Sequence, residues 1–144
     1  MRPYAYDRYK GLQSLLQICG DEGCHFLTLC SIIDEWRETH QLPYIDLIDV
    51  IRYSIKQGWV ANDFYVINDL ELLSKYTCGH KWTRREVTEL PFINDNDYTE
   101  AVYYNKRTNF KHYRRRAFDT LDDSVTVKEG AIKEYRIYTD KGAV

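Results

Sequence analysis

The sequence has 144 residues, of which 44% are hydrophobic and 29% charged, and its formal net charge at pH 7 is −2. This composition excludes a disordered chain, and the length predicts one domain, because domains most often have about 100–150 residues. The slight negative charge argues against a general nucleic-acid binder, which is usually basic. No apolar run approaches the ~18 residues of a membrane helix, and the polar N-terminal residues do not resemble a signal peptide. We therefore expect a soluble, cytoplasmic protein without a membrane partner.

The first part of the chain predicts helices. Apolar residues at 12–19 favour a short helix, and the segment 20–23, with two glycines, is expected to break it. A longer helix is predicted from about 24 to 39, because its apolar residues form a wide stripe. Asp34 and Glu35 are expected to lie on its more exposed side.

Two more helices and several strands follow. The helices are predicted at 45–57, closed by Gly58, and at 69–76. The β-prone runs are 82–88, 101–104, 110–118, 124–128 and 132–138, the last two flanking a Glu-Gly hairpin signal. Helices first and antiparallel strands second are typical of the α+β class, with the helices packed on one side of a sheet.

Cys24 is the first candidate for a catalytic residue. It is predicted to open the long helix after a glycine-containing loop, so that its sulfur would lie at a helix N-terminus. There the unpaired backbone N–H groups and the helix dipole favour an anion. A free thiol, with a pKa of about 8.5, is only slightly ionised at pH 7, and such a position lowers that pKa. The alternative is a buried cysteine that acts as a small apolar side chain.

A cysteine nucleophile needs a base, and the chain has four histidines. His25 is the next residue on the same helix and points about 100° away from the cysteine, so we do not expect it to serve. His40 and His80 are predicted in loops. His112 lies in a β-prone run, and is favoured because folding could bring this rigid element next to the helix start. Asp119 could orient the imidazole of His112 or simply form a turn.

Short motifs around these residues form an ordered pattern. They are Gln17 with Gly23-Cys24-His25-Phe26, then His112-Tyr113, Asp119-Thr120-Leu121, Ser124-Val125-Thr126-Val127, Gly130 and Arg136-Ile137-Tyr138. Over most of the chain this pattern resembles the papain-like cysteine peptidase superfamily, and most closely its small bacterial and phage members.

The resemblance implies one papain-like domain over residues 1–144, in which a helix that carries the cysteine packs against a sheet that carries the base. It also implies the roles of four residues: Cys24 as nucleophile, His112 as base, Asp119 as its orienting partner and Gln17 as a donor to the oxyanion. The protein would be a cysteine peptidase or amidohydrolase that transfers the acyl group of a peptide or isopeptide bond, in a peptide or protein substrate, without a cofactor or metal. A catalytically degenerate relative would keep only the fold.

Two departures from the family pattern leave parts of this site open. Gln17 lies seven residues before Cys24, whereas the family has its glutamine about six residues before the nucleophile. Positions seven apart on one regular strand point to opposite faces, so His112 and Asp119 converge only if a bulge or turn intervenes. The third role could instead fall to another nearby side chain: Asn109, Asp122 or Asp123.

A zinc site is one alternative to a thiol enzyme. The side chains of Cys19, Cys24, Cys78 and His80 are all of a kind that ligates zinc. The chain has no Cys-x₂-Cys pair, which structural zinc sites usually use. The spacing therefore favours the thiol interpretation.

A non-enzymatic interaction domain on the same fold is the other alternative. Basic residues interleaved with aromatic ones can bind single-stranded nucleic acid, and they occur here as Arg84-Arg85, Lys106-Arg107, Lys111 and Arg114-Arg115-Arg116. A solvated strand face explains these residues as well, and we favour that interpretation over nucleic-acid binding. The tyrosine clusters 4–9 and 103–104 could pack a homo-oligomer interface or belong to the core.

Overall fold

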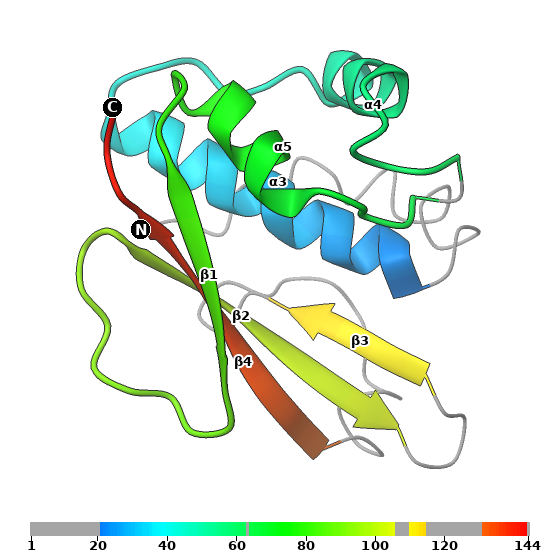
Figure 1. Ribbon diagram of the computed structural model, residues 1–144, viewed down its shortest axis with the longest axis vertical. Helices are drawn as coiled ribbons and strands as arrows, with labels where there is room; N and C mark the ends of the chain where they lie inside the picture. The colour runs from blue at the N-terminus through cyan, green and yellow to red at the C-terminus, as the bar shows by residue number, and fades with distance from the viewer. Residues whose placement is uncertain (1–20, 63, 106–109, 115–130, 144) are drawn as a thin grey trace.

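The computed structural model describes residues 21–62, 64–105, 110–114 and 131–143. In chain order these ranges form the helices α3 (Asp21–Thr39), α4 (Leu47–Lys56) and α5 (Asp69–Tyr76), then the strands β1 (Trp82–Val87), β2 (Asp97–Asn105), β3 (Phe110–Arg114) and β4 (Ala131–Asp140). Figure 1 shows the helices gathered above the strands. The predicted α+β class, with helices first and antiparallel strands second, is confirmed.

Within the described residues the strands form one four-stranded sheet in the order β1-β4-β2-β3, and every neighbouring pair is antiparallel. β4 lies in the interior of the sheet, although it is the last of these strands in the sequence. The pairing of β2 with β4 shifts register between Val102 and Tyr103, which is a local bulge. β2 and β3 are sequential neighbours and pair from Ala101 with Arg114 to Asn105 with Phe110.

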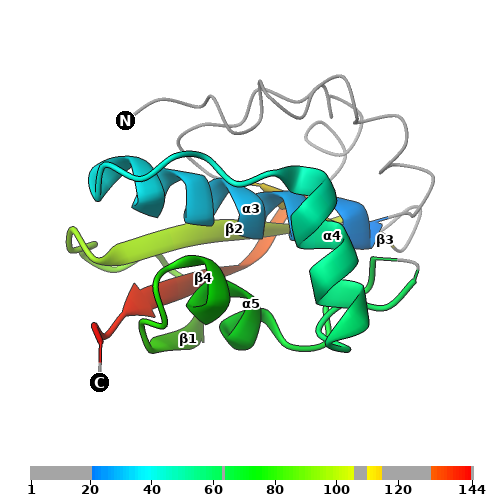
Figure 2. The ribbon, with the colours of Figure 1, turned by 90° about the horizontal axis from the view of Figure 1, so that it is seen from above.

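α3 is the central helix of the hydrophobic core. Its buried apolar side chains are Phe26, Leu27, Leu29, Cys30, Ile32, Ile33 and Trp36. Figure 2 shows that α3 runs over β2, with α4 crossing near one end of it. The expectation that Asp34 and Glu35 are more exposed is wrong, because both are buried. Asp34 is tolerated there because its carboxylate accepts a hydrogen bond from the Ile45 backbone N–H at 3.0 Å.

The start of α3 also differs from the prediction. The helix begins at Asp21, three residues before Cys24, so residues 21–23 are helical and do not form the expected break. Acidic residues stabilise the first turn of a helix, and Asp21 and Glu22 occupy that turn, which offsets the helix-breaking tendency of Gly23. Cys24 therefore lies in the first turn of α3 and does not open the helix.

The two shorter helices have clear local signals. The Asp46 carboxylate caps α4 by accepting from the backbone N–H groups of Ile48 at 3.0 Å and Asp49 at 3.3 Å. The Asn68 side chain caps α5 in the same way from Glu71 at 3.2 Å. Gly58, just beyond α4, has a φ of +78°, a conformation that glycine adopts without strain. The prediction for α5 matches its bounds, and that for α4 is two residues too long at its start and one at its end.

Some sequence predictions fall on other parts of the chain. The helix at 12–19 and the strand at 124–128 lie outside the described residues, as does the end of the run at 110–118. The strand predicted at 132–138 is the central part of β4, and the run 101–104 lies within the longer β2.

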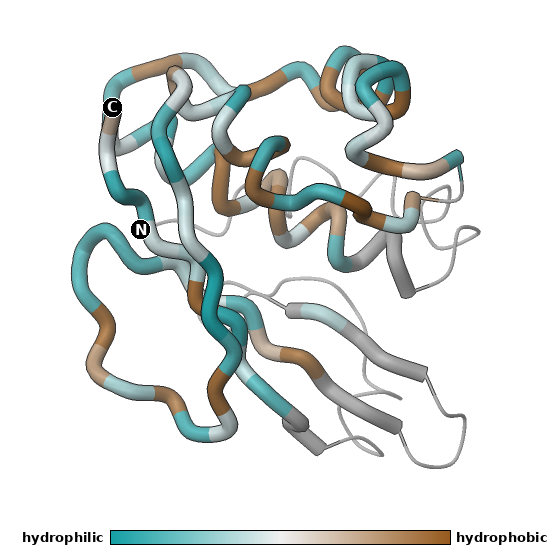
Figure 3. The backbone as a smooth tube through the Cα atoms, viewed as in Figure 1, coloured by the Kyte–Doolittle hydropathy of each residue, from teal (hydrophilic) through white to brown (hydrophobic). Residues whose placement is uncertain are grey.

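β1 is an edge strand of the sheet and is largely hydrophilic, as Figure 3 shows. Its charged residues Arg84, Arg85 and Glu86 are exposed, which discourages pairing with a further strand. No helix in the described ranges combines the length and the apolar character needed to span a membrane.

Candidate functional site

The four residues predicted for the thiol site fall in two groups. Cys24 lies in the first turn of α3, and His112 lies in the middle of β3, paired in register with Tyr103 of β2. Gln17 and Asp119 are outside the described residues, and so are the alternatives for the third role. The structure therefore gives backbone positions for Cys24 and His112, and none for the other two residues.

The helix and the strand that carry Cys24 and His112 pack against each other. The best evidence comes from the next residue in each element: the rings of His25 and Tyr113 lie with their centroids 4.5 Å apart, tilted by 31°. Both side chains are buried between α3 and the sheet. Cys24 and His112 therefore each precede, by one residue in the chain, a residue through which α3 contacts β3.

A buried carboxylate lies beside this contact. Glu100, on β2, is fully buried (0% exposed), and its Oε2 accepts a hydrogen bond from His25 Nδ1 at 2.7 Å. The hydroxyl of Thr28, one turn further along α3, donates to the same oxygen. The hydroxyl of Tyr138, on β4, lies 3.5 Å from Oε1. Because a carboxylate only accepts, His25 carries its ring proton on Nδ1.

The charge of Glu100 is compensated by Arg136. The two residues are register partners on β2 and β4, so their side chains share the face of the sheet toward α3. Burial lowers the pKa of the Arg136 guanidinium, but Glu100 together with Tyr113, Tyr138 and Glu134 outweighs this effect and raises it above the ordinary value. The guanidinium also lies over the ring of Tyr113, 5.2 Å from its centroid, and 3.8 Å from a carboxylate oxygen of Glu86.

A second carboxylate continues the network toward α5. Asp69, the first residue of α5, accepts from Arg84 Nη1 at 2.5 Å and from the Tyr138 hydroxyl at 3.1 Å. Burial, followed by the charges of Glu100 and Asp69, raises the pKa of Tyr138 well above its ordinary value. Tyr138 therefore remains protonated, and its single O–H lies between the two carboxylates, closer to Asp69 than to Glu100.

This network joins two buried carboxylates to several neighbouring groups. The guanidiniums of Arg136 and Arg84 lie beside Glu100 and Asp69, and Arg136 also lies within 4.0 Å of carboxylate oxygens of Glu86 and Glu134. With His25 only 4% exposed, a substrate has no direct approach to its ring. The network therefore holds α3 and α5 on the sheet, and we assign it a positioning role.

Sequence reasoning missed the network, although one signal for it was present. Tyr98, Glu100 and Val102 alternate along β2, and the two apolar members mark the buried face. A glutamate between them on that face must have buried partners. His25 was set aside as a base, and its pairing with a carboxylate 75 residues away could not be read from local spacing.

A second polar cluster joins the end of α3 to the end of β4. The carboxylate of Asp140 accepts from Trp36 Nε1 at 2.8 Å, from His80 Nδ1 at 2.8 Å and from the Gly142 backbone N–H at 2.8 Å. These three donors outweigh the effect of burial and hold the pKa of Asp140 below its ordinary value. The ring of His40 stacks on Trp36 at a centroid distance of 3.8 Å. The cluster ties the last turn of α3 to the C-terminal end of the sheet.

The described part of the chain contains no cluster of ligands that would support the zinc alternative. No group of three or more His, Cys, Asp or Glu side chains is arranged there to hold a metal ion. Of the four residues proposed for zinc, Cys78 is exposed on a turn, His80 pairs with Asp140, and Cys19 lies outside the described ranges. Cys30, the remaining cysteine, is buried in the core.

The basic residues of the interaction alternative are only partly described. Arg84 pairs with Asp69, while Arg85 is exposed on β1. Lys111 and Arg114 lie on β3, and Lys106, Arg107, Arg115 and Arg116 lie outside the described ranges.

Comparison with known proteins found no match for this chain. No family model matches the chain, and neither a curated protein nor a solved structure does so.

Proposed function

We propose that the protein is a thiol hydrolase of papain-like architecture that cleaves a peptide or isopeptide bond, with Cys24 as nucleophile and His112 as base. The observation that supports the proposal is the packing of α3 on β3, seen in the contact between His25 and Tyr113. The pairing of Cys24 with His112 itself comes from the sequence pattern. Papain-like enzymes require this juxtaposition of a helix start and a strand, and the α+β arrangement supports it.

In the proposed reaction, His112 takes the thiol proton of Cys24, and the thiolate attacks the carbonyl carbon of the scissile bond. The resulting oxyanion is held by N–H donors near the helix start and by the Gln17 amide. The C–N bond then breaks, and the amine leaves with the proton from the imidazolium. Water, deprotonated by His112, hydrolyses the thioester and releases the acid and the thiol. Asp119 orients the imidazole.

The start of α3 three residues before Cys24 refines this mechanism. The N–H groups without intrahelical partners belong to the residues at the beginning of a helix, which here precede the cysteine. The first-turn position still lies within reach of the helix dipole, which stabilises a thiolate. The mechanism therefore depends more on the Gln17 side chain than a cysteine at the very start of the helix would require.

The rate at which each cysteine reacts tests the proposal. The folded full-length protein is treated with iodoacetamide between pH 5 and 9, and the modified peptides are quantified by mass spectrometry. Exposed Cys78 is the internal reference, because it is accessible and no nearby group is proposed to activate it. We expect Cys24 to react several-fold faster than Cys78 at pH 6, since a lowered pKa keeps more of it ionised. The His112→Gln variant should remove this advantage and leave the rate at Cys78 unchanged.

Equal or slower reaction of Cys24 than of Cys78 across this pH range would contradict the proposal. Far-ultraviolet circular dichroism of His112→Gln shows whether the variant is folded, so that lost reactivity is not confused with unfolding. Hydrolysis is tested separately, with a library of fluorogenic peptides and the Cys24→Ala variant as the blank.

A further inference from the structure

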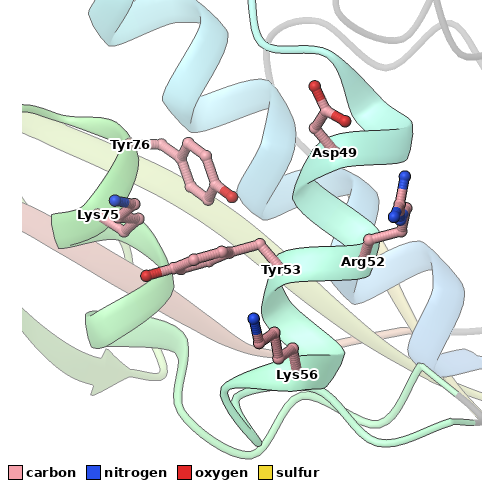
Figure 4. A pocket seen from close by; sticks show the side chains of 6 residues that line it. All are labelled: Asp49, Arg52, Tyr53, Lys56, Lys75 and Tyr76. Carbon is pink, nitrogen blue, oxygen red and sulfur yellow. The ribbon is translucent and has the colours of Figure 1, made fainter.

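A pocket of about 450 Å³ lies between α4 and α5, which together supply its lining. It is lined by Asp49, Arg52, Tyr53 and Lys56 from α4 and by Lys75 and Tyr76 from α5. Its volume falls within the range of about 300–1,000 Å³ that is typical of small-molecule sites. Figure 4 shows the two tyrosines extending toward each other from the two helices, with the lysines on either side.

The spacing on α4 places one polar stripe along the pocket. Asp49, Arg52, Tyr53 and Lys56 follow the i, i+3, i+4, i+7 pattern of a single helix face. The core contacts of α4 come from Leu47, Val50 and Ser54, which are buried. The pocket face is thus separate from the face that anchors the helix.

The charges around the pocket are unbalanced. Three cations and one carboxylate give a formal charge of +2. Within the described ranges Arg52, Lys56 and Lys75 form no salt bridge, and the Lys75 ammonium instead lies 4.9 Å from the ring centroid of Tyr53. The helix C-termini favour Lys56 and Lys75, and Asp49–Arg52 and Glu71–Lys75 have the spacing of stabilising opposite-charge pairs, whereas Arg52 and Lys56 are a like-charge pair four residues apart. The lining of the pocket still has a formal charge of +2, because Asp49 is its one carboxylate.

Tyr76 adds a neutral donor to these cations. Burial, and then the nearby Cys30, Tyr53 and Asp49, raise the pKa of Tyr76 to about 12. The phenol therefore keeps its proton at neutral pH, and its O–H can donate to an anion. A phosphate monoester matches this set, because it carries about −1.5 to −2 charges at pH 7 and three acceptor oxygens.

We propose that the pocket between α4 and α5 binds the phosphoryl group of a small phosphate-bearing molecule. Arg52, Lys56 and Lys75 supply the charge, and the Tyr76 hydroxyl supplies a hydrogen bond. Arg52 can bind two phosphate oxygens at once through its planar fork, whereas the lysines act as point charges. Asp49 opposes binding and limits the site to ligands with more than one negative charge.

Titration calorimetry of the full-length protein tests this site with three probes: phenyl phosphate, inorganic phosphate and phenol. We expect both phosphates to bind and phenol not to bind. Tighter binding of phenyl phosphate than of inorganic phosphate would identify an organic phosphate as the ligand, and equal binding would identify the free ion. If neither phosphate binds, or if phenol binds as tightly as phenyl phosphate, the proposal is wrong.

A matched pair of double variants locates the binding. Arg52→Glu with Lys56→Glu should weaken phosphate binding at least about tenfold, because it reverses two of the three charges. Lys81→Glu with Arg85→Glu makes the same change in net charge at exposed positions near β1, and should alter the affinity less than twofold. Equal losses in both pairs would place the effect in the overall charge and overturn the assignment.

A milder variant separates a loss of phosphate binding from a loss of folding. Arg52→Gln removes one charge without reversing it, and is expected to weaken phosphate binding several-fold while the circular dichroism spectrum is unchanged. Unaltered affinity in a folded Arg52→Gln variant would also contradict the proposal. The Cys24→Ala variant should bind phosphate normally, so the outcome does not depend on the proposed hydrolase.

Discussion

Two groups of charged residues in this protein differ in how far neighbouring residues compensate their charges. Where α3 and α5 meet the sheet, the carboxylates of Glu100 and Asp69 lie beside the guanidiniums of Arg136 and Arg84 and accept hydrogen bonds from neighbouring side chains. Between α4 and α5, three cations surround a cavity with one carboxylate. The carboxylates of the first group are buried, whereas the cavity of the second group is partly open to solvent.

The difference shows which charges serve the fold and which are available to a ligand. A charge inside the core must be compensated by the protein itself, because water cannot reach it. A charge at an open cavity can remain uncompensated, since water solvates it until a ligand arrives. Substitutions in the two groups should therefore separate a loss of stability from a loss of binding.

The largest effect is expected for Glu100→Ala. It removes the buried negative charge beside Arg136 and the acceptor for His25 and Thr28. Removing one member of a buried charged pair costs about 3–5 kcal/mol, so the free energy of unfolding in urea should fall by roughly this amount. The control is Glu89→Ala at an exposed position, where a change within about 0.5 kcal/mol is expected. A similarly small change at Glu100 would show that the network does not support the fold.

Asp140→Asn should have an intermediate effect that depends on pH. The pKa of Asp140 is lowered in the folded protein, so its ionised form contributes stability above the pKa of the unfolded chain, about 3.9. This contribution is lost as the pH falls through the lower pKa of the folded state. We expect the variant to be less stable by about 1–2 kcal/mol at pH 7 and to differ less from the wild type near pH 2. Urea unfolding at the two pH values measures this, and a loss that is the same at both would contradict the assignment.

Asp46→Ala tests how firmly α4 is held beside the pocket. It removes the acceptor for the N–H groups of Ile48 and Asp49, and the loss of a helix cap costs about 1 kcal/mol. Asp46→Ser keeps a capping oxygen and should restore most of the stability. If the alanine and serine variants unfold alike, the cap does not determine the stability of α4.

The smallest change in stability is expected for Arg52→Gln. Its side chain is exposed and forms no salt bridge in the described part of the chain, and the substitution also relieves the repulsion from Lys56. The free energy of unfolding should change by less than about 0.5 kcal/mol, measured by urea denaturation, while phosphate binding falls several-fold. A loss of stability as large as that at Glu100 would remove the contrast between the two regions.

The sequence predicted the elements where local signals dominate. α5 runs over its predicted range because a capping asparagine and an apolar stripe both mark it. α3 was predicted to begin at Cys24 because two glycines suggested a loop, but the acidic residues of that segment also suit a helix start. The burial of Asp34 and Glu35 was missed because α3 is enclosed on more than one side, so periodicity no longer separates inside from outside.

The candidate sites were predictable to different degrees. α3 and β3 pack against each other, as the predicted α+β arrangement requires, whereas the placement of Cys24 and His112 in one site and their roles remain predictions. Glu100 and Arg136 depend on a strand register set by tertiary pairing, and no local rule provides it. The phosphate pocket depends on how α5 docks beside α4, so its residues are separated by about twenty positions in the sequence and share no motif.

The position of β4 in the sheet has a consequence for how the chain folds during synthesis. β4 is the last of these strands to leave the ribosome, yet it alone joins β1 to β2. Among the described strands β1 pairs only with β4, so it has no partner until residues 131–140 emerge. Until then Glu100 also lacks Arg136, its register partner on β4. Such long-range pairing slows folding. Nascent chains stalled before β4 should therefore remain sensitive to protease, and protection should appear only once that strand has emerged from the ribosome.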